Sequence, residues 1–278
     1  MKPFGFRRSI SFMLLVGCMA ILLLAACDSR HSFSETDFPA RQVAVGNKTY
    51  GYRIYVPPNG DPNAKIPVML YLHGSGARGD DNHSQAEWFD ADITPIKDKI
   101  NFIVVLPQCK ADSFWGSTEM ADYALAALDQ SINEFNGDPD RLYLAGFSLG
   151  GYGAWQIAAV HPGKFAAIVP VAGGIVGVDP VEPQVRPEVI PELLSMLESP
   201  DPYKTVAAAI GPTPIWAFHG TEDENVPVDF TRKMVNAMRD AGYQNVKYTE
   251  YQGAKHSISS RVFNEPGLLE WLARQKRN

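Results

Sequence analysis

The sequence contains few cysteines, no long run of basic residues and no repeats. Each of these features excludes a class of protein. Only 3 of the 278 residues are cysteine, which excludes a framework of several disulfides, and none lies in a CxxC pair typical of zinc or redox sites. No run of five basic residues occurs and the formal net charge is -6, so nucleic acid is not an expected partner. No internal repeat or low-complexity tract is evident.

What remains is the composition of a globular protein. Hydrophobic residues make up 45% of the chain and aromatic residues 11%, which excludes a disordered chain. The 23 glycines and 21 prolines follow no period, which excludes collagen. The length allows one large domain or two small ones with a substantial core.

The first 27 residues differ in character from the rest. A positive start with Lys2, Arg7 and Arg8 precedes a stretch from Ser9 to Ala26 without charge, which is the pattern of an export signal. The stretch ends in Leu24-Ala25-Ala26-Cys27, which resembles the bacterial lipobox, whose cysteine is acylated before the signal is removed. The alternative is a retained transmembrane anchor, since the stretch approaches the ~20 residues that cross a bilayer.

We therefore expect a signal peptide over residues 1–26, a lipidated Cys27 with a polar tether over 27–40, and one folded domain over 41–278. Asp28 resembles the signal that keeps enterobacterial lipoproteins in the inner membrane. The resemblance implies an exported protein, facing the periplasm or the cell exterior and held to a membrane through Cys27. Cys18 would leave with the signal, so Cys109 has no disulfide partner.

Strand-like and helix-like segments alternate from Arg41 onward, which is typical of an α/β domain with a mostly parallel central sheet and helices on both faces. Short apolar runs predict strands at 50–56, 67–73, 102–106, 142–147, 165–171, 214–219 and 246–251. Helical spacing predicts helices at 120–134, 150–160, 229–241 and 266–275. A Pro-rich segment at about 174–214, with short helical stretches near 192–197 and 203–210, interrupts the alternation, and we expect it to form a lid-like insertion.

A glycine-rich motif lies between a predicted strand and a predicted helix, in Gly146-Phe147-Ser148-Leu149-Gly150-Gly151. In this context GxSxG predicts a nucleophile elbow, a tight turn that exposes the Ser148 hydroxyl. Glycine is needed at 146 and 150 because a Cβ atom would clash where the chain doubles back, and Gly151 lets the helix pack closely. The alternative is a Ser148 that only caps the helix.

A serine nucleophile needs a base to accept its proton and an acid to orient that base. In the elbow type of hydrolase these follow in the order serine, acid, histidine. Of the six histidines, His256 is the candidate base, because it lies in a loop between the last predicted strand and the last predicted helix. His161 ends the helix after the elbow and His219 closes a strand, while the other three histidines precede the serine.

The acid is expected just after the strand that ends at His219. The pattern HG-x-x-D-x-x-VP favours Asp223 over its neighbours Glu222 and Glu224. Asp179, which follows an earlier strand, is the rival, because some hydrolases place the acid there.

A second glycine-containing loop, His73-Gly74-Ser75-Gly76, closes a predicted strand and can offer a backbone N–H to an oxyanion. The second donor is expected at Leu149, the residue after the nucleophile. Ser75 is preferred over Gly76 as the loop donor, and His73 is expected to hold the loop; the alternative is a simple glycine turn. Trp115 is expected to line the substrate cleft, with packing as the alternative.

From about Gly51 to Arg274 these motifs, in this order, resemble the α/β-hydrolase superfamily. More narrowly, the chain is similar to carboxylesterases related to polyhydroxybutyrate depolymerases, feruloyl esterases and the catalytic domain of prolyl oligopeptidase. The segments that carry this resemblance are 72–82, 107–109, 138–141, 146–153 and 216–220.

The resemblance implies a serine esterase that cleaves small or polymeric carboxylic esters through an acyl-enzyme, with no metal and no organic cofactor. No obligate protein partner is evident from the sequence. Two alternatives stay open, a peptidase of the prolyl oligopeptidase type and a non-catalytic binding module. The chain departs from its relatives in the Pro-rich insertion, which leaves the substrate undefined.

Overall fold

The computed structural model describes residues 33–58, 64–177 and 187–277, which all belong to one compact unit, Phe33–Asn278. The expected signal peptide, Cys27 and Asp28 lie outside the described residues, as do Asp179 and the rest of residues 178–186 of the insertion. Within the described ranges, no helix is both long and apolar enough to cross a membrane.

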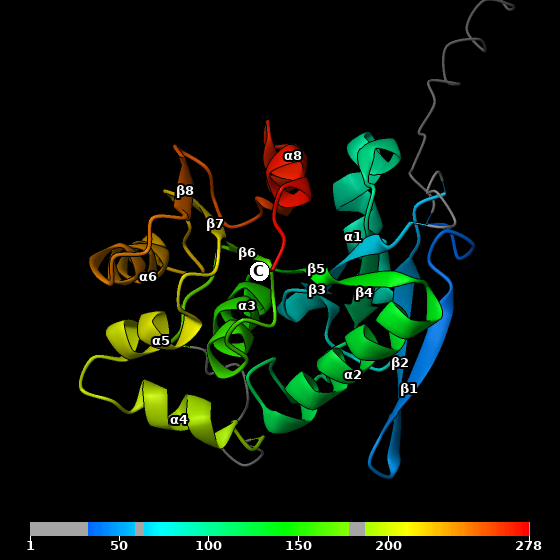
Figure 1. Ribbon diagram of the computed structural model, residues 1–278, viewed down its shortest axis with the longest axis horizontal. Helices are drawn as coiled ribbons and strands as arrows, with labels where there is room; N and C mark the ends of the chain where they lie inside the picture. The colour runs from blue at the N-terminus through cyan, green and yellow to red at the C-terminus, as the bar shows by residue number, and fades with distance from the viewer. Residues whose placement is uncertain (1–32, 59–63, 178–186, 278) are drawn as a thin grey trace, which may run out of the picture. The chain divides into compact units, whose positions relative to one another are not determined.

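An eight-stranded sheet forms the centre of the domain (Figure 1), in the order β1-β2-β4-β3-β5-β6-β7-β8. The first two strands run antiparallel to their neighbours, and the other six are parallel. The strands are β1 (Ala40–Val45), β2 (Lys48–Tyr55), β3 (Ile66–Leu72), β4 (Ile103–Pro107), β5 (Gly137–Phe147), β6 (Ala167–Val171), β7 (Ile215–Gly220) and β8 (Val246–Tyr251). This confirms the predicted mostly parallel α/β architecture.

Helices cover both faces of the sheet, and each layer encloses its own hydrophobic core (Figure 1). One layer holds α2 (Thr118–Glu134), α3 (Leu149–Val160), α5 (Pro202–Ile210) and α6 (Val228–Asp240). The other holds α1 (Ser84–Ile93), α7 (Ser259–Phe263) and α8 (Leu268–Ala273), with the 3-10 turns η1 (Ser75–Ala77) and η2 (Thr94–Lys99) beside α1.

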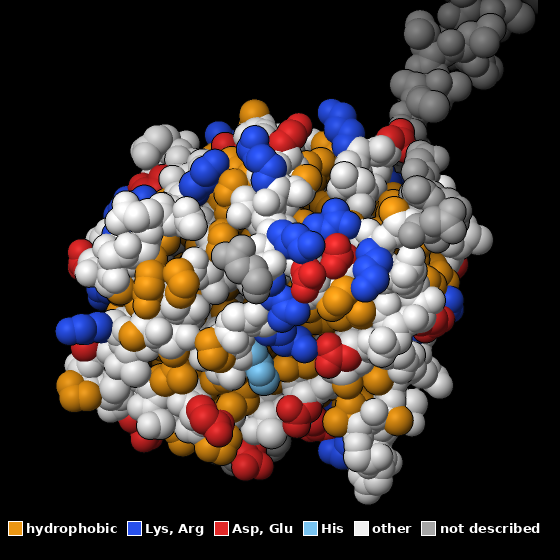
Figure 2. All heavy atoms as spheres, in the orientation of Figure 1, with side chains coloured by type: hydrophobic (Ala, Val, Ile, Leu, Met, Phe, Trp, Pro, Cys, Tyr) orange, Lys and Arg blue, Asp and Glu red, His pale blue; other side chains and the backbone are white. Residues whose placement is uncertain are grey.

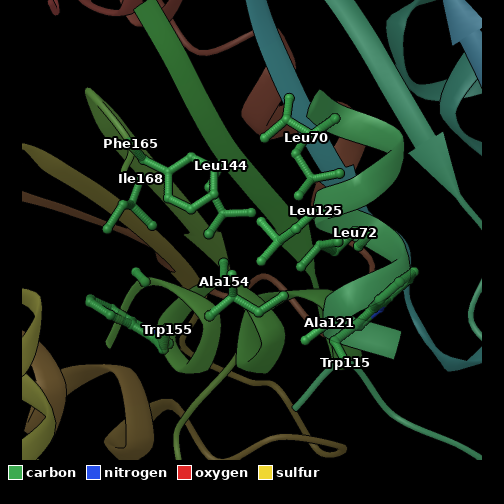
Figure 3. Close-up of a cluster of buried hydrophobic side chains, with 14 of the residues drawn as sticks. Leu70, Leu72, Trp115, Ala121, Leu125, Leu144, Ala154, Trp155, Phe165 and Ile168 are labelled. Atoms are coloured by element: carbon green, nitrogen blue, oxygen red, sulfur yellow. The ribbon is translucent and has the colours of Figure 1, made fainter. Parts of the chain in front are cut away.

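Alternate residues of each strand point into opposite cores, as the two-residue period of a strand requires. In β3, Leu70 and Leu72 belong to the core beneath α2 and α3, whereas Met69 and Tyr71 belong to the core beneath α1. Figure 3 shows the first of these cores, where side chains of β3, β5 and β6 meet Leu125 of α2 and Trp155 of α3. Burial on both faces explains why the strands read as continuous apolar runs.

The structure adds elements that the apolar pattern did not predict. β1 is an edge strand in which exposed and buried residues are mixed. α1 carries charged residues among its apolar ones, and α7 is short. Residues 33–39, expected to belong to the tether, instead contact the domain. Phe38 is fully buried, and Arg53 donates hydrogen bonds to the Phe38 carbonyl and to the Glu35 carboxylate. The domain therefore begins earlier along the chain than residue 41.

The described part of the Pro-rich insertion extends the helical layer. α5 packs against α3 and α6, and α4 (Pro191–Leu197) packs against α3 and α5 (Figure 1). Just before α4, the Ile190 N–H donates to the Gly116 carbonyl and the Thr118 N–H to the Glu188 carbonyl. These contacts fasten the return of the insertion to the start of α2; the lid itself stays a prediction.

Candidate active site

The candidate site lies at the carboxyl edge of the parallel sheet, where loops from four strands meet. The chain passes from β3 to β4 on one side and then returns to place β5 on the other side of β3. Such a reversal opens a crevice beyond the carboxyl ends of the two strands, which is where α/β proteins bind ligands. Ser148 follows β5 and the loop from His73 follows β3, so both flank this point.

Ser148 occupies a strained turn between β5 and α3. Its φ of 55° and ψ of -116° place a non-glycine residue in a region that costs roughly 1–3 kcal/mol, which is the backbone expected of a nucleophile elbow. A Cβ atom on Gly146 would collide with the Gly150 carbonyl, and one on Gly150 with the Leu72 carbonyl. A Cβ atom on Gly151 would collide with the Val171 carbonyl. The turn thus requires the three predicted glycines.

Three side chains predicted as a triad form one hydrogen-bonded chain in the structure. The Ser148 Oγ atom lies 2.8 Å from His256 Nε2, and His256 Nδ1 lies 2.7 Å from Asp223 Oδ2. Ser148 is 9% exposed and the Asp223 side chain is fully buried, so the chain runs from the surface inward. This is the geometry in which imidazole can accept a hydroxyl proton while a carboxylate fixes its tautomer.

Asp223 is held in place by donors on both carboxylate oxygens. Its Oδ1 accepts from the Asn225 and Val226 N–H groups, and its Oδ2 faces His256 Nδ1 and, at 3.1 Å, His219 Nε2. Burial alone would raise the pKa of Asp223, but hydrogen bonds from His219, His256 and Val226 outweigh it and hold this pKa well below its usual range. The carboxylate is therefore ionised at neutral pH.

Hydrogen bonds join the loop of the acid to the loop of the base. The Glu222 N–H donates to the Ala254 carbonyl at 3.0 Å, and the Gly253 N–H donates to Thr221 Oγ1 at 2.9 Å. Gly220 lets the two loops approach, because a Cβ atom there would collide with the Ala254 carbonyl. The loops after β7 and β8 therefore form one unit that carries Asp223 and His256.

The loop after β3 brings backbone donors close to the serine. A Cβ atom on Gly74 would lie 3.4 Å from Ser148 Cβ, so the two segments are in contact. Ser75 is the first residue of η1 and Leu149 the first of α3. N–H groups at the first position of a helix have no acceptor within it and are free to bind an anion.

His73 ties this loop down from below, as expected. Its Nδ1 donates to the Gly74 carbonyl at 2.7 Å, and its Nε2 accepts from the Cys109 N–H at 2.9 Å. Burial lowers the pKa of His73 to about 4, so the ring is neutral and keeps this tautomer at neutral pH.

Trp115 does not line a cleft, which corrects the prediction for that residue. Its ring is fully buried, packs edge-on against His73 and donates from Nε1 to the His73 carbonyl at 3.0 Å. Deep burial under the loop leaves no ring surface for a substrate. Trp115 supports the loop instead, because an indole N–H that is buried must find an acceptor.

Two residues beside the site were missed by sequence reasoning. His219 was assigned only to a strand end, although its i,i+4 spacing to Asp223 in HG-x-x-D was a usable signal. Trp88 in α1 is 48% exposed, and its ring covers Gly76, where a Cβ atom would collide with it. Nothing in the local sequence marked Trp88. In the described part of the chain, no group of three or more metal-ligating side chains is present.

Residues 110–275, more than half of the chain, match the sequence profile of the prolyl oligopeptidase family. The chain is similar to a protein of Nocardia uniformis subsp. tsuyamanensis named "Putative esterase NocK", with 28% identity over 188 residues, 63% of this chain and 52% of the relative. It is also similar to acyl-protein thioesterase 1 of Candida albicans, with 27% identity over 74% of this chain and 90% of the relative.

A similar solved structure is that of a thermostable esterase, with a TM-score of 0.67 and 27% identity. The likeness covers 87% of this chain and 64% of that one. The chain thus spans about half the length of NocK and less than two thirds of the thermostable esterase.

Proposed function

The chain belongs to the prolyl oligopeptidase family, and we propose that it is a serine hydrolase that cleaves carboxylic esters through Ser148, His256 and Asp223. The observation that carries the proposal is the continuous hydrogen-bonded chain from Ser148 Oγ through the His256 ring to the buried Asp223 carboxylate. Likeness to an esterase and a thioesterase supports acyl transfer as the reaction class.

The proposed reaction has two halves. Ser148 Oγ attacks the ester carbonyl while His256 Nε2 accepts its proton, and the tetrahedral intermediate collapses as the C–O bond to the alcohol breaks and His256 protonates the departing oxygen. Water then attacks the acyl-enzyme, giving its proton to His256, which returns it to Ser148 as the acid leaves. Asp223 stays ionised throughout and stabilises the transient imidazolium ion.

The negative charge of each tetrahedral intermediate is assigned to two backbone donors, the N–H groups of Leu149 and Ser75. Both begin a helical turn, and the Gly74 segment contacts the serine. Loss of one such donor typically lowers the rate by ~10²- to 10³-fold.

The proposed function is tested with a short p-nitrophenyl ester on the purified chain. We expect turnover by the native protein and a loss of roughly 10⁴-fold or more in Ser148→Ala, since the nucleophile is removed. Ser260→Ala, an exposed serine of α7, is the matched control and keeps full activity. An unaltered rate in Ser148→Ala, or no turnover by a folded native protein, would reject the proposal.

A peptidase is the second candidate, because the family takes its description from prolyl oligopeptidase. The two functions share every group named above and differ in the leaving group, which is an amine rather than an alcohol. A proline-containing peptide p-nitroanilide assayed beside the ester separates them. Comparable kcat/KM values on the two substrates would favour the peptidase.

Trp88, rather than Trp115, is our candidate for the aromatic wall of the substrate site. α1 contacts both η1, which carries the Ser75 donor, and α7, which follows His256. A half-exposed indole over Gly76 therefore stands beside Ser75, one of the two proposed oxyanion donors. We expect Trp88→Ala to raise KM about tenfold for aromatic esters, the scale of a lost aromatic contact, and Trp88→Phe to retain most of the affinity. Equal KM values for all three proteins would remove Trp88 from the site.

Anchoring through Cys27 is proposed on the lipobox pattern alone. More than one acyl chain is needed to hold a protein firmly on a membrane. Growth with radiolabelled palmitate should label the native protein and Cys18→Ser but not Cys27→Ser. Label retained in Cys27→Ser would exclude this anchor.

A further inference from the structure

His219 lies at the end of β7, fully buried, with polar neighbours at both ring nitrogens. Nδ1 is 2.8 Å from Thr231 Oγ1 of α6. Nε2 is 3.0 Å from the Val226 carbonyl and 3.1 Å from Asp223 Oδ2. The ring thus touches the proposed acid of the triad at Oδ2, the same oxygen that faces His256 Nδ1.

Each of these neighbours accepts a hydrogen bond. The single proton of Thr231 is committed, because its hydroxyl donates to the Gly173 carbonyl at 2.7 Å, so Thr231 Oγ1 can only accept from His219. The Val226 carbonyl has no proton to give. Asp223 has none either, since both its oxygens receive N–H donors. A neutral histidine has one donor and one acceptor nitrogen and cannot satisfy acceptors on both sides.

We propose that His219 is a buried imidazolium ion, protonated on both nitrogens, which shares the Asp223 carboxylate with His256. The hydrogen-bond arrangement itself does not depend on the proposed function; only its effect on the reaction rests on it. His219 is a positioning residue, because it acts on the triad through Asp223 and does not reach the substrate.

The charged groups around His219 favour a cation at this position. Asp223 touches the ring, and Glu250 stands opposite His219 in the pairing of β7 with β8. Arg232 of α6 is already paired with Glu250 at 2.7 Å and with Asp229 at 2.9 Å. Hydrogen bonds from Arg232 and Tyr248 outweigh the effect of burial and lower the pKa of Glu250, so this carboxylate is also ionised. Direct contact with a carboxylate offsets the cost of burying the imidazolium.

The consequence concerns the base of the triad. A fixed positive charge beside Asp223 disfavours a second positive charge on His256. The charge on His219 therefore opposes protonation of the His256 ring, which must be neutral to accept the Ser148 proton. The reaction gains activity on the acidic side of its pH profile.

The first experiment reads the ring directly and needs no substrate. In the full chain labelled with ¹⁵N-histidine, we expect one ring at neutral pH to show a bonded proton on both nitrogens, in slow exchange with water. His219→Gln should remove this signal, and Ser148→Ala should retain it. A neutral-pH spectrum in which every buried histidine ring has one unprotonated nitrogen overturns the proposal even if no His219 variant folds.

The second experiment measures the pH dependence of kcat/KM. Glutamine at 219 can keep a donor near Asp223 but carries no charge, so we expect the acidic limb of His219→Gln to move upward by roughly one pH unit. His161→Gln, at the far end of α3, is the control and leaves the limb in place. A lower rate with an unmoved limb would mean that His219 only supports the structure and overturns the proposal. Absence of ester turnover in the native protein would instead reject the proposed function and leave the ¹⁵N result intact.

Discussion

Asp223 receives four donors while its side chain is shielded from water, so single atoms at this residue decide the state of the site. Replacing one carboxylate oxygen with an amide nitrogen places the N–H groups of the amide opposite the N–H groups that donate to Asp223 in the native protein. Asp223→Asn should therefore favour the wrong tautomer of His256, with Nε2 protonated toward the serine. We expect kcat for the ester to fall by about 10³- to 10⁴-fold with the fold retained.

Glu224→Gln is the matched control for Asp223→Asn. Glu224 is exposed, one residue away, and its ion pair with Lys255 spans 3.7 Å at the surface, so its loss should leave kcat unchanged. The measurement is ester turnover beside circular dichroism. If Asp223→Asn kept more than a tenth of native kcat, the acid would have to be sought elsewhere, and Asp179 would return as a candidate.

At the scale of elements, α1 and α7 meet through Asp92 and Ser259, three residues after the proposed base. Burial raises the pKa of Asp92 to about 6, and a hydrogen bond from Ser259 offsets only part of this. The folded protein then binds a proton that the unfolded chain has lost, so the contribution of Asp92 to stability falls as pH rises from about 4 to 6. Above pH 6 the ionised, buried carboxylate destabilises the fold.

Asp92→Asn should therefore be more stable than the native protein at pH 7.5, by about 1–2 kcal/mol, and equal to it at pH 4. Urea denaturation at the two pH values measures the difference. The exposed Asp80→Asn serves as the comparison and should change the free energy of unfolding by little at either pH. An equal effect of Asp92→Asn at both pH values would contradict a titrating carboxylate.

Elements differ in how far the sequence predicts them, and the difference follows burial. β3, β4, β6 and β7 are buried on both faces and were predicted from their apolar runs. β1 lies at an edge, and its mixture of exposed and buried residues gave no such run. α1 places charged residues among its apolar ones, and α7 spans 5 residues, too few for a helical period to be recognised.

The candidate site follows the same division. Ser148, Asp223 and His256 could be predicted because an elbow motif and a fixed order along the chain constrain them. The sequence did not distinguish the buried Trp115 from the exposed Trp88. Packing between segments that are distant in the sequence decides which of these side chains faces solvent. Trp115 lies beneath the His73 loop and Trp88 above Gly76, on opposite sides of the same loop.

At the scale of the whole molecule, acid and base pairs are interleaved on the surface. Figure 2 shows one face on which Lys and Arg side chains lie among Asp and Glu, with hydrophobic side chains in small scattered groups. Where the C-terminal residues meet the start of β5, Arg141 pairs with Asp138 at 2.7 Å, and Lys276 and Arg277 both pair with Asp140 at 3.6 Å. Exposed pairs of this kind each contribute little.

The pH dependence of stability is a property of the whole domain, because buried groups oppose one another. The pKa of His73 is lowered to about 4 in the folded protein, so between pH 6.5 and 4 the unfolded chain binds a proton at this residue that the folded protein does not. The contribution of His73 to the free energy of unfolding is therefore lost as pH falls through that range. Asp92 changes in the opposite sense between pH 6 and 4. We expect the free energy of unfolding to vary little from pH 6 to 4.5 and to fall steeply below pH 4.

The steep loss below pH 4 comes from carboxylates with a lowered pKa, including Asp223 and Glu119, whose pKa is lowered to about 2 by hydrogen bonds from Lys110, Lys48 and Tyr50. Their stabilisation is present above the unfolded pKa and disappears as protons bind. Urea titrations from pH 7 to 2.5 test this, and in Asp92→Asn the decline should begin near pH 6.5. If the native protein lost stability evenly from pH 7 downward, the contributions of His73 and Asp92 would not cancel as proposed.

The site draws one segment from the end of each of four strands, β3, β5, β7 and β8, and its nucleophile and base are 108 residues apart. No fragment that stops before β8 contains the machinery, whatever else it has folded. Contacts this distant in sequence form late, since loop closure must precede them. During synthesis, the proposed activity would thus appear only after β8 has left the ribosome and joined the sheet, so ester turnover would measure completion of the fold. A chain divided between α6 and β8 would separate Ser148 and Asp223 from His256. Each fragment alone would be inactive, and recovery of ester turnover would measure their reassembly.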